Sequence, residues 1–210
     1  MPSFPSFLIS EPLAIDLVNT RFYLSGGWVD LLDTPGTRAE WLTAETARLG
    51  FPPEEAADFS DDVATALKSV RQHAAEAIEP ARHGKRPPAR ALTGLNTALR
   101  AAPAIPEAHW NGTAIATTQR RSGALSDRIA CSFAEATIEL LAAPLILRVR
   151  RCDAPDCVAL FLPRNPSRRW CTPRICGNRA RVARYYLRHK DDEPNVRDAA
   201  HDEPGPEESA

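Results

Sequence analysis

CDAPDC (residues 152–157) and CTPRIC (residues 171–176) are two cysteine pairs with the same internal spacing. Together they form the pattern C-x4-C-x13-C-x4-C. Two pairs that short turns can close, separated by one loop, supply the four ligands that a tetrahedral ion takes from a small segment. The sequence therefore predicts one metal site, made of Cys152, Cys157, Cys171 and Cys176.

Zinc is the ion we expect, because four thiolates suit Zn²⁺, although iron fits the same ligand set. Four sulfurs leave no open position for water, so the ion would be structural and would drive the folding of about 40 residues. The alternative is four unconnected thiols or a redox switch. Cys131 stands apart in an apolar stretch, and we expect a small buried hydrophobic residue there.

The segment that contains these cysteines is strongly basic. Residues 148–190 have a net charge of +10, residues 1–147 of −4 and residues 191–210 of −7. This segregation predicts a polyanionic partner for the middle segment and a disordered acidic tail after it. The alternative is a solvated basic face in an arginine-rich protein.

The sequence predicts a helix from Ile175 to Lys190, launched from the fourth cysteine. Arg181, Arg184 and Arg188 fall on one face of this helix. Val182 and the two tyrosines that follow fall on the other face, which could pack on the metal module. DNA is the partner we expect, since guanidinium groups contact phosphates and guanine edges. The predicted nucleic-acid-binding residues are Arg164, Arg168, Arg169, Arg174, Arg179, Arg181, Arg184 and Arg188.

The tetrapeptide Cys-Gly-Asn-Arg at residues 176–179 joins the metal site to this helix. Cys176 would close the site, and Gly177 would let the backbone turn away from it. Asn178 would cap the helix. Arg179 has two readings: it contacts phosphate, or it donates hydrogen bonds to carbonyl groups within the finger, which we favour slightly.

Before residue 147 the pattern is mostly helical. Helices are expected near residues 11–20, from an N-cap at Thr34 with Pro35 first, from Ser60 to about Ile78, near 91–99 and over 122–143. A brief extended piece, WVDLL, precedes Thr34, and Trp41 and Leu42 should face inward. The helix from Ser60 has one apolar stripe, formed by Val63, Leu67, Val70, Ala74 and Ile78. The helix over 122–143 is apolar on two faces and is ended or kinked by Pro144. Asn111-Gly112, between two short runs, predicts a tight β-hairpin, and residues 145–150 suggest a short extended connection. The expected fold is mainly α (α+β): a helical domain with a small hairpin at 1–147, a treble-clef or ribbon-like zinc module ending in a basic helix at 148–190, and the acidic tail at 191–210.

Asp16 and Asn19 lie three residues apart in the otherwise apolar stretch LAIDLVNT. A small-molecule site is one interpretation, and a buried hydrogen-bond network is the favoured one. The chain contains no nucleophile elbow, phosphate loop or HExxH pattern, so we expect no enzyme. It also contains no apolar run of the roughly 20 residues that cross a bilayer and no secretory signal, so a cytoplasmic location is expected.

The stretches RRCDAPDC, NPSRRWC and CGNRARV resemble the CGNR zinc finger. LAIDLVNT and DLLDTPGTRAEWL resemble the ABATE domain, the mostly helical module that precedes this finger in bacterial proteins described as stress-induced transcription regulators. The resemblance covers about residues 11–190. It implies zinc at the four cysteines and a DNA-binding finger.

The sequence thus predicts a zinc-dependent DNA-binding transcription regulator. Its helical domain would sense a small-molecule effector or form a homodimer. The alternative is a zinc-stabilised adaptor whose finger docks a protein or RNA partner.

Overall fold

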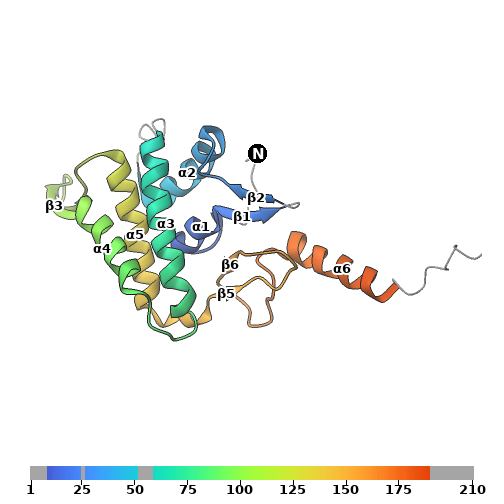
Figure 1. Cartoon of the computed structure of the whole chain (residues 1–210). Helices are drawn as coiled ribbons and strands as arrows, with labels where there is room; N and C mark the ends of the chain where they lie inside the picture. Colours follow the sequence, from blue (N-terminus) through green and yellow to red (C-terminus); the bar gives the residue numbers. More distant parts are fainter. Residues whose placement is uncertain (1–8, 25–26, 52–58, 190–210) are drawn as a thin grey trace, which may run out of the picture.

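The computed structural model describes residues 9–24, 27–51 and 59–189 (Figure 1). Its body is a group of packed helices: α1 (Leu13–Asn19), α2 (Pro35–Leu49), α3 (Asp61–Ala81), α4 (Ala89–Ala101) and α5 (Leu125–Ala142). These five helices, with the hairpins between them, are called the helical domain below. The acidic tail predicted at 191–210 lies outside the described residues.

Helices α3 and α5 form the centre of the helical domain. The apolar stripe predicted for α3 is confirmed, since Val63, Leu67, Val70, Ala74 and Ile78 are all buried. Helix α5 packs against α1, α3 and α4, as expected for a helix that is apolar on two faces. Among the described residues, two of the largest fully buried side chains, Trp41 of α2 and Phe133 of α5, stack with ring centroids 5.5 Å apart.

Local sequence signals set the bounds of α2. Thr34 is its N-cap with extended backbone angles, and Pro35 occupies the first helical position, as predicted. The helix ends at Gly50, whose φ of 73° lies in the left-handed region that glycine adopts without strain. The predicted inward positions of Trp41 and Leu42 are confirmed, because both are fully buried.

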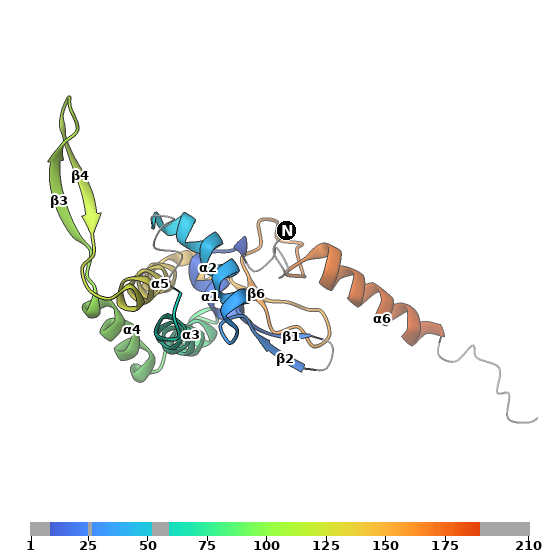
Figure 2. The same ribbon diagram turned by 90° about the horizontal axis from the view of Figure 1, so that it is seen from above.

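Two antiparallel hairpins interrupt the helices. The hairpin of β3 (Ile105–Trp110) and β4 (Ile115–Arg120) is confirmed, and Figure 2 shows that it projects away from the helices. Its turn has four residues, and the Asn111 side chain accepts the N–H groups of Thr113 and Ala114. The hairpin of β1 (Arg21–Leu24) and β2 (Gly27–Asp30) was foreseen only as one short extended piece.

The chain after α5 differs from the predicted extended connection. Pro144–Arg148 is a 3-10 helix, because proline at the first helical position has a fixed φ that suits a helical turn. Extended backbone begins at Val149 and continues into β5 (Arg150–Arg151), which pairs with β6 (Leu160–Phe161). A π-helix at Pro173–Gly177 then leads into α6 (Asn178–His189). The predicted mainly helical fold, with small hairpins and a cysteine module ending in a helix, is confirmed.

Within the described residues, no helix combines the length and the apolar character that a membrane span requires.

Candidate metal centre and basic helix

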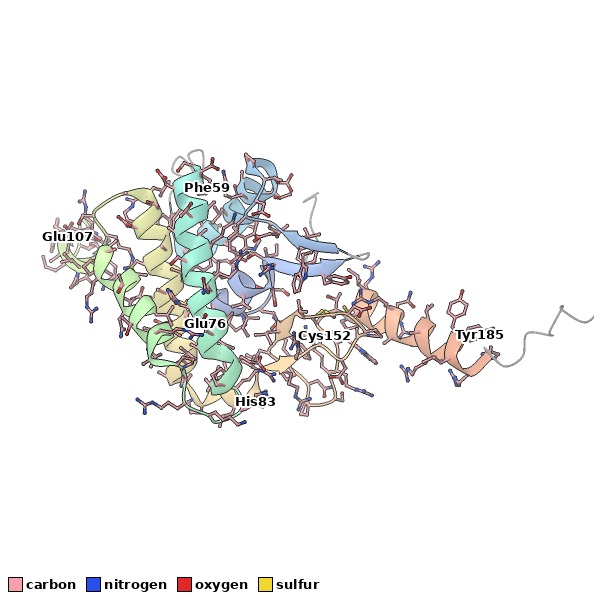
Figure 3. All side chains as sticks on the ribbon, viewed as in Figure 1. Phe59, Glu76, His83, Glu107, Cys152 and Tyr185 are labelled. Carbon is pink, nitrogen blue, oxygen red and sulfur yellow. The ribbon has the colours of Figure 1, made fainter. Side chains whose placement is uncertain are left out.

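The two cysteine pairs lie together in the segment that follows the helical domain (Figure 3). All four sulfur atoms fall within 4.8 Å of one another. The hairpin of β5 and β6 brings the first pair into position, since Cys152 donates its N–H to the carbonyl of Ala159 at 2.9 Å. The backbone N–H of Cys171 points at the sulfur of Cys152, at 3.3 Å. The predicted four-cysteine set is therefore one spatial cluster.

The sulfur positions fit a tetrahedral ion. Cys171 lies 3.8 Å from Cys157 and 3.4 Å from Cys176, and Cys176 lies 3.7 Å from Cys157, all measured between sulfur atoms. A tetrahedron with metal–sulfur bonds of about 2.3 Å has sulfur–sulfur edges of about 3.8 Å. All four cysteines are free of disulfides. The donor set and its geometry therefore match a closed metal site.

The four thiols cannot all ionise at this spacing without a cation. Hydrogen bonds with the neighbouring thiols, Cys157 first, lower the pKa of Cys152. The corresponding contacts, with Cys152 first, raise the pKa of Cys171. A bound divalent ion removes this conflict, because it stabilises the thiolate form of every ligand.

The Cys-Gly-Asn-Arg segment works differently from the prediction for two of its residues. Gly177 lies outside the left-handed region, and its lack of a side chain makes room for the ring of Trp170. Asn178 has helical angles (φ −68°, ψ −47°), so it continues the helical run and does not occupy the extended N-cap position. The reason is that the π-helix passes directly into α6, which leaves no break to cap.

Arg179 points toward the metal site. Its Nη2 lies 3.8 Å from the sulfur of Cys176. The guanidinium therefore places a positive charge beside the fourth ligand, whose thiolate adds to the negative charge of the site. The contact lies within the finger, but it is to sulfur and not to the carbonyl groups that we expected.

The predicted nucleic-acid-binding arginines differ in exposure: Arg168 and Arg179 are partly buried, and the other six are exposed. Arg168 is mostly buried and donates hydrogen bonds to Glu11, Trp170 and Cys171. Arg169 pairs with Asp153 at 2.8 Å but stays 63% exposed. The others, apart from Arg179, have exposed side chains; they are Arg164, Arg174, Arg181, Arg184 and Arg188.

Helix α6 extends away from the body of the protein (Figure 1). Its sequence contains no acidic residue, and Arg181, Arg184 and Arg188 flank an open groove of about 500 Å³ along it. Val182 and Tyr185 line the same groove, so the predicted apolar residues do not form a separate face packed on the metal module, which corrects our expectation. Val182 is 46% exposed, Tyr185 56% and Tyr186 69%, and Tyr185 stands clear of the module in Figure 3.

Comparison with known families accounts for both parts of the chain. The family model of ABATE, whose description is "Putative stress-induced transcription regulator", matches residues 11–144. The chain belongs to the ABATE family. The model of the CGNR zinc finger matches residues 148–189, which contain all four cysteines and α6. Both resemblances noted in the sequence are confirmed. No curated protein matches the chain significantly.

Asp16 of the ABATE domain is fully buried, and its contacts are those of a hydrogen-bond network. Its carboxylate accepts a hydrogen bond from Arg48 at 2.7 Å, and Glu45, also fully buried, accepts one from the same guanidinium nitrogen at 2.8 Å. Burial raises the pKa of Asp16 to about 7, although the hydrogen bond from Arg48 lowers it. Burial and then the charge of Asp16 raise the pKa of Glu45 to about 8. A ligand site at Asp16 and Asn19 stays a prediction.

Asn19 and Glu11 connect the ABATE domain to the finger. The Asn19 amide pairs with both backbone groups of Leu160, at 2.9 Å each. Glu11 accepts hydrogen bonds from the backbone N–H of Leu162 and from Arg168, at 2.8 Å each. Glu11 is not among the residues predicted from the sequence, because an acidic residue just before a short helix is usually solvated and no local pattern marks its distant partner.

Proposed function

We propose that this ABATE-family protein is a transcription regulator that binds DNA through α6 of a zinc-loaded finger. The helical domain would hold the finger and would act as the sensing or dimerising part. The protein would act by binding and not by catalysis. The family description supports regulation, and the cysteine cluster supports the metal.

Zinc is the proposed ion because four thiolates in tetrahedral geometry are its common structural ligand set. We expect one zinc ion per chain in protein purified without chelators, measured by elemental analysis. Iron in place of zinc would change the identity of the metal but keep the site. No stoichiometric metal would contradict the site itself.

The observation that carries the DNA proposal is the exposed basic side of α6. Arg181, Arg184 and Arg188 lie on a helix of 12 residues, about 18 Å long, without an acidic residue. A single helix of this size fits the major groove, which is about 12 Å wide. Arginines in this arrangement neutralise phosphates, and one or two of them can read guanine edges.

The salt dependence of binding tests this proposal. Replacing Arg181, Arg184 and Arg188 together by alanine should weaken DNA binding and reduce the slope of log K against log salt by about one for each lost phosphate contact. The matched control replaces three exposed arginines of the helical domain, Arg86, Arg100 and Arg120, and should leave the slope unchanged. Equal affinity and slope in both triple variants would refute the DNA-binding role of α6.

A second candidate is an adaptor that binds a protein or RNA partner. The exposed apolar residues of α6 favour a protein partner, because four large apolar side chains lie open on one short helix, namely Val182, Tyr185, Tyr186 and Leu187. Replacing Tyr186 and Leu187 by serine should then abolish partner binding. One stoichiometric protein partner, together with no DNA binding at low salt, would decide for the adaptor.

A further inference from the structure

Residues just before α1 and at its end contact the segments that carry the two cysteine pairs. Asn19, at the end of α1, is 2% exposed, and its amide accepts the N–H of Leu160 and donates to the carbonyl of Leu160. It therefore acts as a strand partner for β6. That strand follows Cys157 closely and pairs with β5, which ends just before Cys152. Asn19 thus holds the segment that positions the first cysteine pair.

Glu11 holds the second pair through Arg168. Glu11 is 7% exposed, and one carboxylate oxygen accepts from Arg168 while the other accepts the N–H of Leu162. The same guanidinium donates to the carbonyl of Cys171, to that of Trp170 at 3.0 Å, and lies 4.6 Å from the ring centroid of Phe161. Arg168 therefore fixes the backbone at the third metal ligand, and Glu11 balances its charge.

Glu11 is itself fixed by the helical domain. Asp16 accepts its backbone N–H at 3.2 Å, and Arg48 donates to its carbonyl at 2.7 Å. Arg48 also binds the buried carboxylates of Asp16 and Glu45. A continuous set of polar contacts thus runs from α2 to the backbone of Cys171.

We propose that Glu11 and Arg168 form a positioning pair through which the helical domain keeps the metal in the finger. The proposal rests on the metal site described above and not on DNA binding. Release of the ion requires the thiolates to separate, and the contacts of Arg168 with Glu11 and with the carbonyl of Cys171 restrain the segment of Cys171. Residues that orient metal ligands typically change metal affinity by 10–100-fold when they are replaced.

Metal release from the full-length, zinc-loaded protein tests this inference. Glu11→Gln keeps an acceptor for Leu162 but removes the charge that faces Arg168. We expect zinc to transfer to an excess of a chromogenic chelator about 10-fold faster than from the unchanged protein. With Co²⁺ as a probe, the visible absorption of the tetrathiolate site should decay at the same increased rate.

The control breaks a comparable ion pair away from the finger. Arg71 and Asp30 pair at 2.5 Å, with side chains 11% and 14% exposed, within the helical domain. Arg71→Gln should lower thermal stability without changing zinc release. Equal release from Glu11→Gln and the unchanged protein, or equal acceleration by both variants, would overturn the proposal.

A double variant shows whether Glu11 acts through Arg168. Release from Glu11→Gln with Arg168→Met should match release from Arg168→Met alone, because the pair is one unit. Additive effects would overturn the assignment.

If Glu11→Gln does not fold, Glu11→Asp provides a second test, because it keeps the charge but shortens the side chain. Glu11→Asp should release zinc faster than the unchanged protein, and unchanged release would count against the pair. An unchanged protein that binds no metal would instead refute the metal site itself.

Discussion

Gly177 lies so close to the indole of Trp170 that a Cβ at residue 177 would stand 3.3 Å from Cε3 of the ring. This distance is tighter than ordinary van der Waals contact, so the ring would have to shift. Trp170 lies beside Cys171, the third cysteine of the cluster, and packs against the small core of the finger. The glycine of the Cys-Gly-Asn-Arg segment is therefore explained by close packing.

Gly177→Ala should destabilise the metal-loaded finger by about 1 kcal/mol, because displacement of the ring outweighs the gain in helix propensity. Gly36→Ala is the matched control, since Gly36 also lies in a helix but has open space around it. That change should stabilise the protein by about 0.5–1 kcal/mol. Chemical unfolding followed by tryptophan fluorescence measures both, and a stabilising Gly177→Ala would contradict the packing argument.

Arg179 should affect the metal more than the nucleic acid. Because its Nη2 lies 3.8 Å from the sulfur of Cys176, Arg179→Ala removes a positive charge beside the fourth ligand and should speed metal release several-fold. In protein kept saturated with zinc, the slope of log K for DNA binding against log salt should stay unchanged. Arg181→Ala should give the reverse pattern, and a reduced slope for Arg179→Ala would place Arg179 at the DNA surface.

The buried carboxylates of Asp16 and Glu45 should make stability depend on pH. Their pKa values rise from ordinary values of 3.8 and 4.5 to about 7 and about 8 in the folded protein. The folded state therefore holds protons that the unfolded chain releases, and stability present below about pH 4 is lost as the pH rises toward 8. Urea unfolding of the zinc-saturated protein should show a loss on the order of 1–3 kcal/mol between pH 5 and pH 8.

Glu45→Gln tests the origin of this pH dependence, since glutamine resembles the protonated acid. The variant should show a flatter profile above pH 6 and should exceed the unchanged protein in stability at pH 8. Glu107→Gln, on the exposed hairpin, serves as the control and should leave the profile as it is. A profile that keeps its slope in Glu45→Gln would assign the pH dependence to other groups.

The sequence predicted the helices and the metal ligands because both depend on short spacings. The stripe from Val63 to Ile78 repeats with the period of a helix, and each cysteine pair closes within six residues. By contrast, Asn19 meets Leu160 across 141 positions and Glu11 meets Arg168 across 157. No local pattern encodes such pairs, so the junction between the two parts emerged only from the fold.

Helix α6 shows another limit of sequence reasoning. Its alternation of arginines with Val182 and the tyrosines is amphipathic, and such a pattern indicates a face that could be buried. It does not indicate which surface would cover that face, and within the described residues Val182 and the tyrosines remain exposed, with Val182 and Tyr185 in the groove of the arginines. Similarly, Pro144 ends α5 as expected, but the pattern could not decide between a strand and the 3-10 helix that follows.

The acidic tail should compete with DNA for the basic segment. Residues 191–210 have a net charge of −7 and directly follow residues 148–190, with +10. Deleting 191–210 should therefore raise DNA affinity several-fold at low salt, and the difference should shrink at high salt, where the charges are screened. A variant with every tail Asp and Glu changed to Asn and Gln separates charge from length and should behave like the deletion. Unchanged affinity in both variants at low salt would exclude competition by the tail.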